Sequence, residues 1–353
     1  MISNESLTKE WFEKVSSKNR KADKILVEKV VRALLLLEGL VKANIEFTFK
    51  GGTALMLLMG STKRLSIDID IIVSKPQELD ELFNAFVGEQ GFTRFELHER
   101  KITSDIKKAH YKFFYKPVHE ENKAEDYVLL DILYEEPHYI KVIQVPIDSS
   151  FVQQEGEPIM VNVPCKEDIL GDKLTAFAPN TTGIPYYKGE DLKAMEIIKQ
   201  LYDIGSLLDA AEDLSIISKT FHVFAQTEIG YRECKIDAVG VLDDIFDTSL
   251  HICSRGKEGS GDYQALSKGI NAVKRFIFSE SYHLDRAITD AAKAAYIATV
   301  LKYNITEFER YKGHEHVKEL VIDQKFSKIL GKLKKGNPEA FFYWYQIYLI
   351  KTA

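Results

Sequence analysis

The stretch FKGGTALMLLMGSTKRLSIDIDIIV, residues 49–73, decides how this chain folds. Its β-prone start is followed by Gly51 and Gly52, which let the backbone turn sharply and come close to a ligand. We expect Thr53 to cap a helix over residues 54–59, which is apolar on nearly every side and therefore buried. A short strand, a glycine turn and a buried helix are thus predicted in succession.

A second strand is predicted over residues 67–73, where Asp68 and Asp70 stand two positions apart. Side chains repeat every two residues along a strand, so both carboxylates leave the same face. Two like charges at this distance are unfavourable unless a cation lies between them, and carboxylate oxygens suit Mg²⁺, which substrate phosphates usually share. The apolar strand predicted over residues 127–134 carries a single charge, Asp131, which is tolerated there when it pairs or binds metal. We therefore expect Asp131 to join Asp68 and Asp70 as catalytic residues and metal ligands.

These motifs resemble the nucleotidyltransferase superfamily of DNA polymerase β type, and more closely the AbiEii/AbiGii toxin family, to which the MenT toxins are related. The closer resemblance is carried by Lys50-Gly51-Gly52-Thr53-Ala54-Leu55 and by Arg64-x-Ser66-x-Asp68-Ile69-Asp70. Two shorter family motifs fit residues 167–176, which include Lys173, and the segment Lys199-x-x-x-Asp203. The gap between Gly52 and Asp68 is longer than in the general superfamily and similar to that of the toxin family. The resemblance covers roughly residues 45–210.

The resemblance implies an α+β fold in two domains. Residues 1–165 would form a polymerase-β-like nucleotidyltransferase core of mixed sheet and helices, and residues 166–353 a mostly helical domain that completes the cleft. The implied reaction moves a nucleotide from a nucleoside triphosphate (NTP) to an acceptor hydroxyl with two Mg²⁺ ions, and releases pyrophosphate. The implied acceptor is the 3′ end of a tRNA. The implied role is that of the toxin in a toxin–antitoxin or phage-defence system, with a cognate antitoxin as protein partner.

The candidate nucleotide-binding residues are Lys50, Gly51, Gly52, Thr53, Arg64, Ser66, Lys173, Lys199 and Asp203. The two glycines and Thr53 would offer N–H groups and a hydroxyl to the triphosphate at a helix N-terminus, where the dipole favours an anion. The structural alternatives are a plain helix start at the glycines, a surface arginine at position 64 and a Lys173 that reaches water past apolar neighbours. Lys199 and Asp203 would then form an exposed ion pair one helical turn apart.

The net charge of −6 gives the chain no overall attraction for a nucleic acid, so a nucleic-acid substrate would have to bind to local basic patches. Two other readings of the site stay open. The same core would also suit nucleotide transfer to a small molecule, such as an antibiotic, or to a protein side chain. A catalytically silent nucleotide-binding module would keep the fold, although the presence of all three carboxylates speaks against it.

The N-terminus is charged and lacks the apolar core of a secretory signal, and the chain has no long apolar run. We therefore expect a cytoplasmic protein without a membrane partner. Two helices are expected over residues 5–43, further strands over 92–97 and 109–115, edge strands over 140–145 and 159–163, and helices over 166–177 and 191–208. The basic run 325–335 is expected to be a solvated helix face or, as the alternative, to hold an RNA backbone through its lysines. The aromatic run 341–348 is expected to be core.

Overall fold

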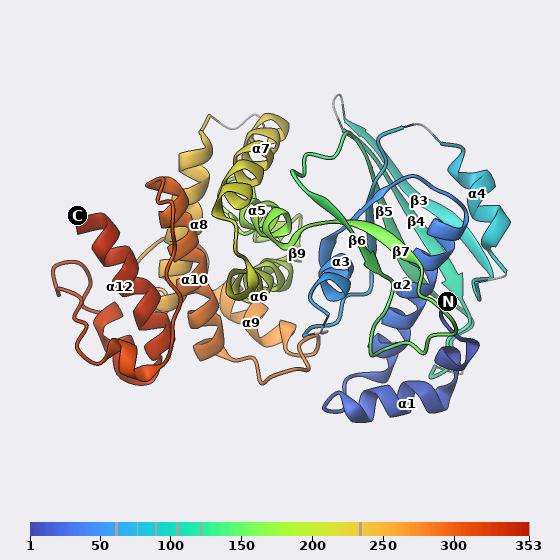
Figure 1. Cartoon of the computed structure of the whole chain (residues 1–353), viewed down its shortest axis with the longest axis horizontal. Helices are drawn as coiled ribbons and strands as arrows, with labels where there is room; N and C mark the ends of the chain where they lie inside the picture. Colours follow the sequence, from blue (N-terminus) through green and yellow to red (C-terminus); the bar gives the residue numbers. More distant parts are fainter. Residues whose placement is uncertain are drawn as a thin grey trace. The chain divides into compact units, whose positions relative to one another are not determined.

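The computed structural model describes residues 1–60, 63–75, 77–88, 90–103, 106–120, 122–232 and 235–352. The chain divides into two compact units (Figure 1). The first consists of Met1–Cys165 and Arg275–Ser281, and the second of Lys166–Lys274 and Tyr282–Ala353. A segment from late in the chain therefore packs with the N-terminal unit.

The first unit is built on a five-stranded mixed sheet. In spatial order its strands are β1 (Thr48–Lys50), β2 (Ile69–Ile72), β5 (Asp126–Tyr134), β4 (Ile106–Tyr115) and β3 (Arg94–Thr103). Strands β2 and β5 run parallel, whereas the other neighbouring pairs are antiparallel. The predicted α+β class and mixed sheet are confirmed, and the two strands that carry Asp70 and Asp131 are neighbours.

Helices cover one face of this sheet. They are α2 (Lys24–Lys42), α3 (Gly51–Leu58) and α4 (Leu79–Phe86), whereas α1 (Lys9–Lys18) and the 3₁₀ turn η1 (Asn4–Leu7) pack on α2. Helix α2 is capped by Asp23, whose carboxylate accepts the N–H groups of Ile25 and Leu26 at 2.9 and 3.3 Å. On α4, Phe83 packs edge-on against Phe113 of β4 with ring centroids 5.1 Å apart. The opposite face of β4 and β5 is left more open, as their alternating burial shows.

The two predicted edge strands pair with each other. Strands β6 (Val142–Pro146) and β7 (Met160–Pro164) form a separate antiparallel sheet of two strands. Both end at a proline, which has no N–H to donate to a further ladder. Each strand of a two-stranded sheet is an edge strand, so the prediction of edge strands is confirmed.

The second unit is helical apart from a small hairpin. Its helices are α5 (Lys166–Ala176), α6 (Ala194–Ala210), α7 (Leu214–Arg232), α8 (Ala238–Cys253), α9 (Tyr263–Val273), α10 (Leu284–Lys302), α11 (Leu333–Gly336) and α12 (Pro338–Thr352), with 3₁₀ turns η2 (His314–Val317) and η3 (Leu330–Lys332). The hairpin pairs β8 (Tyr187–Lys188) with β9 (Asp191–Leu192). Helix α6 therefore begins three residues later than predicted, because residues 191–192 are used in the hairpin.

The C-terminal aromatic run is core, as predicted. On α12, Phe341, Phe342, Tyr343 and Trp344 are buried. The basic run before it is not one helix face, however, because it is divided into turns, η3 and α11, with Gly331 and Gly336 weakening any longer helix.

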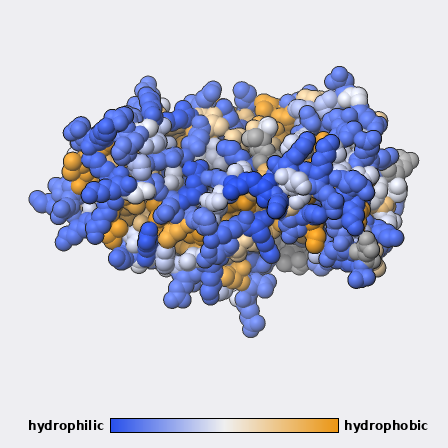
Figure 2. All heavy atoms as spheres, turned by 90° about the horizontal axis from the view of Figure 1, so that it is seen from below, coloured by the Kyte–Doolittle hydropathy of each residue, from blue (hydrophilic) through white to orange (hydrophobic). Residues whose placement is uncertain are grey.

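Most of the surface seen in Figure 2 is hydrophilic, with hydrophobic atoms in small scattered groups. Among the described residues, no helix combines the length and the apolar character needed to cross a membrane.

Candidate active site

The parallel pairing of β2 and β5 places Asp70 directly beside Asp131. Their neighbours Ile69 and Leu130 form the preceding pair of the same register, and both are buried. Asp70 and Asp131 are half-buried on the alternate face, where their side chains leave the sheet together. Two strands that are separate in sequence thus bring two carboxylates to one place on the open face of the sheet.

The glycine turn lies against the first of these carboxylates. Antiparallel pairing sets Lys50, at the end of β1, opposite Asp70, and α3 begins at the next residue, Gly51. Gly51 has φ +80°, and a Cβ atom built there would lie 2.2 Å from Oδ2 of Asp70. Only glycine accommodates both this backbone conformation and this approach. The turn and Asp70 therefore form one compact arrangement.

Two further candidate residues surround the second glycine. A Cβ atom on Gly52 would lie 2.6 Å from Oγ of Ser66 and 2.7 Å from Nη2 of Arg64. Arg64 is buried, and its Nη1 donates to the carbonyl oxygen of Leu65 at 3.2 Å. The alternative of a surface arginine at position 64 is therefore wrong. The structure gathers Arg64 and Ser66 at the N-terminus of α3.

The segment Arg275–Ser281 holds Arg64 and Leu65 in place. Arg64 forms an isolated antiparallel bridge with Ile277, and the N–H of Leu65 donates to the carbonyl oxygen of Phe276 at 2.7 Å. These are backbone contacts, which any sequence can make. Side-chain patterns therefore gave no signal for the return of this segment to the first unit.

Thr53 does not cap the helix as predicted. The N-cap position of α3 is Lys50, which makes no capping bond through its side chain, and Thr53 is buried in the first turn. Its hydroxyl donates to the carbonyl oxygen of Asp68 at 2.7 Å. Asp68 itself lies before β2, because the strand begins at Ile69 and is shorter than predicted. Thr53 thus fixes the backbone from which the Asp68 side chain departs.

Sequence analysis missed a histidine at this site. His110 of β4 is the antiparallel register partner of Asp131, and its Nδ1 lies 2.7 Å from Oδ1 of that residue. The side chains of His110 and Asp131 are 28% and 36% exposed. The alternation of HYKFFY, residues 110–115, places His110 on the open face, but the register that pairs it with Asp131 is a property of the folded sheet.

Three candidate residues belong to the second unit. Lys173 of α5 is buried, and its Nζ lies 2.7 Å from Oδ2 of Asp203 and 3.0 Å from Oε1 of Gln200, both on α6. Asp203 is only 2% exposed, so the alternative of an exposed pair with Lys199 is wrong. The alternative in which Lys173 reaches water is also wrong, because its amine is buried beside Asp203. Lys199 is half-buried on α6.

The chain matches the family described as "Nucleotidyl transferase AbiEii toxin, Type IV TA system" over residues 35–309, well over half of its length. It belongs to the AbiEii nucleotidyltransferase family. The chain is therefore a nucleotidyltransferase of a toxin–antitoxin family, and nucleoside triphosphates are its substrates. The predicted family and enzyme class are confirmed.

Two solved structures resemble this AbiEii-family protein. One, from H. pylori, is described as a candidate nucleotidyltransferase; it is 18% identical, covers 82% of this chain and 100% of its own, and has a TM-score of 0.42. The other is an antigenic nucleotidyltransferase-like protein from Paracoccidioides brasiliensis, 18% identical, with coverages of 62% and 97% and a TM-score of 0.33. No curated protein matches the chain.

The donor chemistry of this AbiEii-family site fits a hard cation. Asp70 and Asp131 are partners in the strand register and present their carboxylate oxygens side by side, and Asp68 lies two residues before Asp70. Oxygen ligands of this kind suit Mg²⁺. Across the described part of the chain, no three Asp, Glu, His or Cys residues are gathered closely enough to form a metal cluster. Asp70 and Asp131 are the two carboxylates that the sheet register brings side by side.

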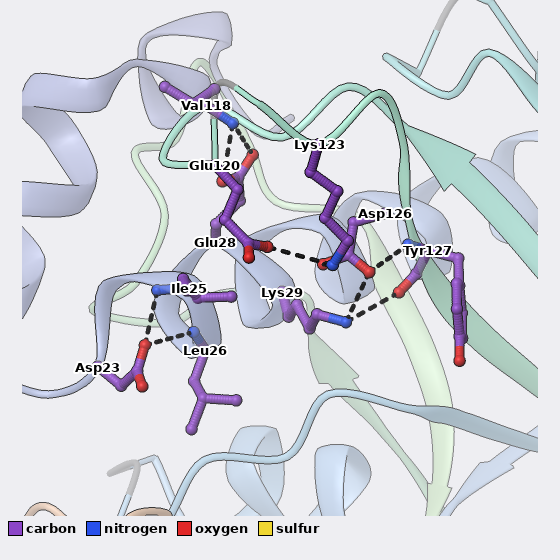
Figure 3. A network of polar contacts seen from close by, with 10 residues as sticks. All are labelled: Asp23, Ile25, Leu26, Glu28, Lys29, Val118, Glu120, Lys123, Asp126 and Tyr127. Atoms are coloured by element: carbon purple, nitrogen blue, oxygen red, sulfur yellow. Dashed lines mark hydrogen bonds and ion pairs between the residues drawn. The ribbon is translucent and has the colours of Figure 1, made fainter.

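A buried polar network anchors the strand that carries Asp131 (Figure 3). The carboxylate of Glu28, on α2, accepts the N–H of Val118 with both oxygens at 3.1 Å, and Lys29 lies 2.9 Å from Oδ1 of Asp126. Lys123 lies 3.1 Å from the other carboxylate oxygen of Asp126. Both ends of the β4–β5 connection are thus tied to α2.

Asp126 is charged in this network despite its burial. Burial by itself raises the pKa of Asp126, but hydrogen bonds from the Lys29 amine and the Tyr127 N–H, together with the charge of Lys29, leave that pKa below its ordinary value. The first residue of β5 is therefore fixed by charged contacts, five positions before Asp131.

Proposed function

We propose that this AbiEii-family enzyme transfers a nucleotide from an NTP to a hydroxyl at the 3′ end of a tRNA, with Mg²⁺ held by Asp68, Asp70 and Asp131. The observation that carries the proposal is the register pair Asp70 and Asp131 beside a glycine turn that admits no side chain. Bound Mg²⁺ would lower the pKa of the attacking hydroxyl and neutralise charge on the departing pyrophosphate.

The glycine turn is suited to the triphosphate. Gly51 and Gly52 begin α3, so their N–H groups lie at a helix N-terminus, where the dipole favours an anion. The guanidinium of Arg64 and the hydroxyl of Ser66 lie against Gly52, and Lys50 precedes the turn. These groups donate hydrogen bonds or carry positive charge, as phosphate recognition requires. Thr53 acts on the site through the backbone of Asp68.

In the transfer step, the acceptor oxygen attacks the α-phosphorus, and the bond between that phosphorus and the bridging oxygen of the β-phosphate breaks. Pyrophosphate leaves with the bonding electrons. Asp131 accepts the proton of the attacking hydroxyl, because its carboxylate is half-buried on the open face beside Asp70. The turn holds the phosphates while this exchange takes place.

Lys173, Lys199 and Asp203 are assigned to the nucleotide on the family motifs alone. The Lys173–Asp203 ion pair supports a role for Asp203 in orienting the lysine, since a buried amine paired at 2.7 Å has one favoured direction. The tRNA acceptor and the Mg²⁺ ions are likewise proposed on the resemblance of the motifs, and membership of a toxin–antitoxin family supports a cognate antitoxin.

The test is incubation of the protein with total tRNA, Mg²⁺ and each α-labelled NTP in turn, beside an Asp68→Ala/Asp70→Ala variant. Label in tRNA with the parent protein alone would establish the acceptor and name the nucleotide. Label in a small molecule or a protein, and none in tRNA, would overturn the tRNA acceptor. The affinity for labelled tRNA, measured at two salt concentrations, adds a second criterion, because only the affinity for a polynucleotide falls steeply with salt.

A further inference from the structure

We infer that His110 is a positioning residue that orients the Asp131 carboxylate for cation binding and transfer. The inference rests on the proposed function, because it deepens the role given there to Asp131. Neither the family motifs in the sequence nor the expected site residues include His110. It is assigned from the hydrogen bond that joins β4 to β5 at the site.

The direction of this hydrogen bond is fixed by its acceptor. In the ionised form that would bind a cation, the Asp131 carboxylate has no proton to give, so Nδ1 of His110 donates to Oδ1 of Asp131 across the 2.7 Å between them. Both the neutral Nδ1–H tautomer and the imidazolium can make this bond. The orienting role therefore holds in either charge state of the ring.

The sheet keeps His110 where this bond can form. Its neighbours in β4, Ala109 and Tyr111, are 0% and 1% exposed and face the helices, so His110 must face the open side with Asp131. The register also sets the two residues directly opposite each other, the shortest side-chain separation that antiparallel strands offer. The imidazole is thus held by the strand ladder and not by a flexible loop.

The bond fixes the orientation of the Asp131 carboxylate. Within the described residues, the hydrogen bond from His110 is the one contact that the structure gives the Asp131 carboxylate. With Oδ1 held, Oδ2 is the oxygen presented to a cation or to the acceptor proton. Without His110, the carboxylate of a half-exposed side chain would rotate among several conformations. Groups that orient a metal ligand in this way typically change metal affinity or activity by about 10- to 100-fold when removed.

The experiment compares His110→Leu, which removes the donor, with His110→Asn, whose amide nitrogen occupies about the place of Nδ1. His98→Leu is the matched control, because His98 is exposed on the adjoining strand β3. Mn²⁺ binding is followed by the electron paramagnetic resonance signal of free Mn²⁺ in the presence of a non-hydrolysable NTP analogue. Transfer rates and thermal unfolding are measured on the same samples.

We expect His110→Leu to weaken Mn²⁺ binding and to lower kcat by about 10- to 100-fold with a smaller change in KM for NTP. His110→Asn should keep most of the Mn²⁺ affinity and most of the kcat of the parent. His98→Leu should equal the parent in both quantities. A His110→Leu protein that unfolds at a lower temperature but binds Mn²⁺ and transfers like the parent would overturn the inference and leave the proposed function standing. A parent protein that neither binds Mn²⁺ nor transfers nucleotide would overturn the proposed function itself.

Discussion

Replacing Gly51 with alanine places a methyl group where the structure has the carboxylate of Asp70. The added Cβ would lie 2.2 Å from Oδ2 and 2.9 Å from Cγ of Asp70. Ordinary van der Waals contact begins at 3.4 Å, so the carboxylate must withdraw by about 1 Å. The φ of +80° adds a backbone strain of about 1–2 kcal/mol for a residue with a side chain.

These two effects have different sizes and different readouts. A shift of about 1 Å in a catalytic group lowers the rate by roughly 100-fold. The strain lowers the melting temperature by roughly 2–8 °C. Gly60→Ala is the matched control, because Gly60 has φ +60° and, among the residues that the structure describes, nothing lies within 4 Å of its added Cβ. Gly52→Ala tests the clash without positive φ, since its Cβ would meet Ser66 and Arg64.

The assay is the initial rate of label transfer from an α-labelled NTP at saturating concentration, with thermal unfolding of each variant measured in parallel. Gly60→Ala should lose stability and keep the parent rate, and Gly51→Ala should lose both. Transfer by Gly51→Ala at the parent rate would refute the reasoning, as would an equal loss of rate in Gly60→Ala.

Three further outcomes are expected. Asp131→Asn should lower transfer by about 10²–10⁴-fold without lowering the melting temperature, and an unchanged initial rate would remove Asp131 from the chemistry. Lys173→Met should lower the free energy of unfolding in urea by about 3–5 kcal/mol, because it leaves the buried charge of Asp203 unpaired. The double variant Lys173→Met/Asp203→Leu should recover most of this loss, and a double variant as unstable as the single would contradict the pairing. The pKa of Asp126 is lowered in the folded protein, so the ionised carboxylate should stabilise the fold fully above about pH 4 and lose this contribution as the pH falls through the folded pKa. Melting curves of Asp126→Asn should show less of this acid-induced loss of stability than the parent.

The sequence was sufficient to place the two strands that carry the carboxylates. Asp70 alternates with apolar residues, and Asp131 is the one charge in an apolar run, so each signal lies within a few neighbouring residues. The pairing of the two strands was predicted from the free-energy cost of burying a charge, because a carboxylate in a buried strand needs a partner. The structure sets Asp70 beside Asp131.

The contacts that sequence analysis did not find all join distant residues. The His110–Asp131 bond depends on strand register, and the Lys173–Asp203 pair joins two helices of the second unit. Thr53 is a residue type that often caps helices, yet its hydroxyl reaches the backbone of Asp68 because α3 begins three residues earlier than expected. Local patterns specify elements, whereas these partners are specified by the packing of the elements.

The most direct test of nucleotide transfer at the Asp70–Asp131 pair uses one NTP labelled either at its α- or at its γ-phosphate, with the parent protein and with Asp70→Asn. We expect the α-label to enter tRNA with the parent protein, the γ-label to leave as pyrophosphate, and Asp70→Asn to transfer neither. Entry of the γ-label into the acceptor, or transfer of the α-label by Asp70→Asn at the parent rate, would contradict the proposed chemistry.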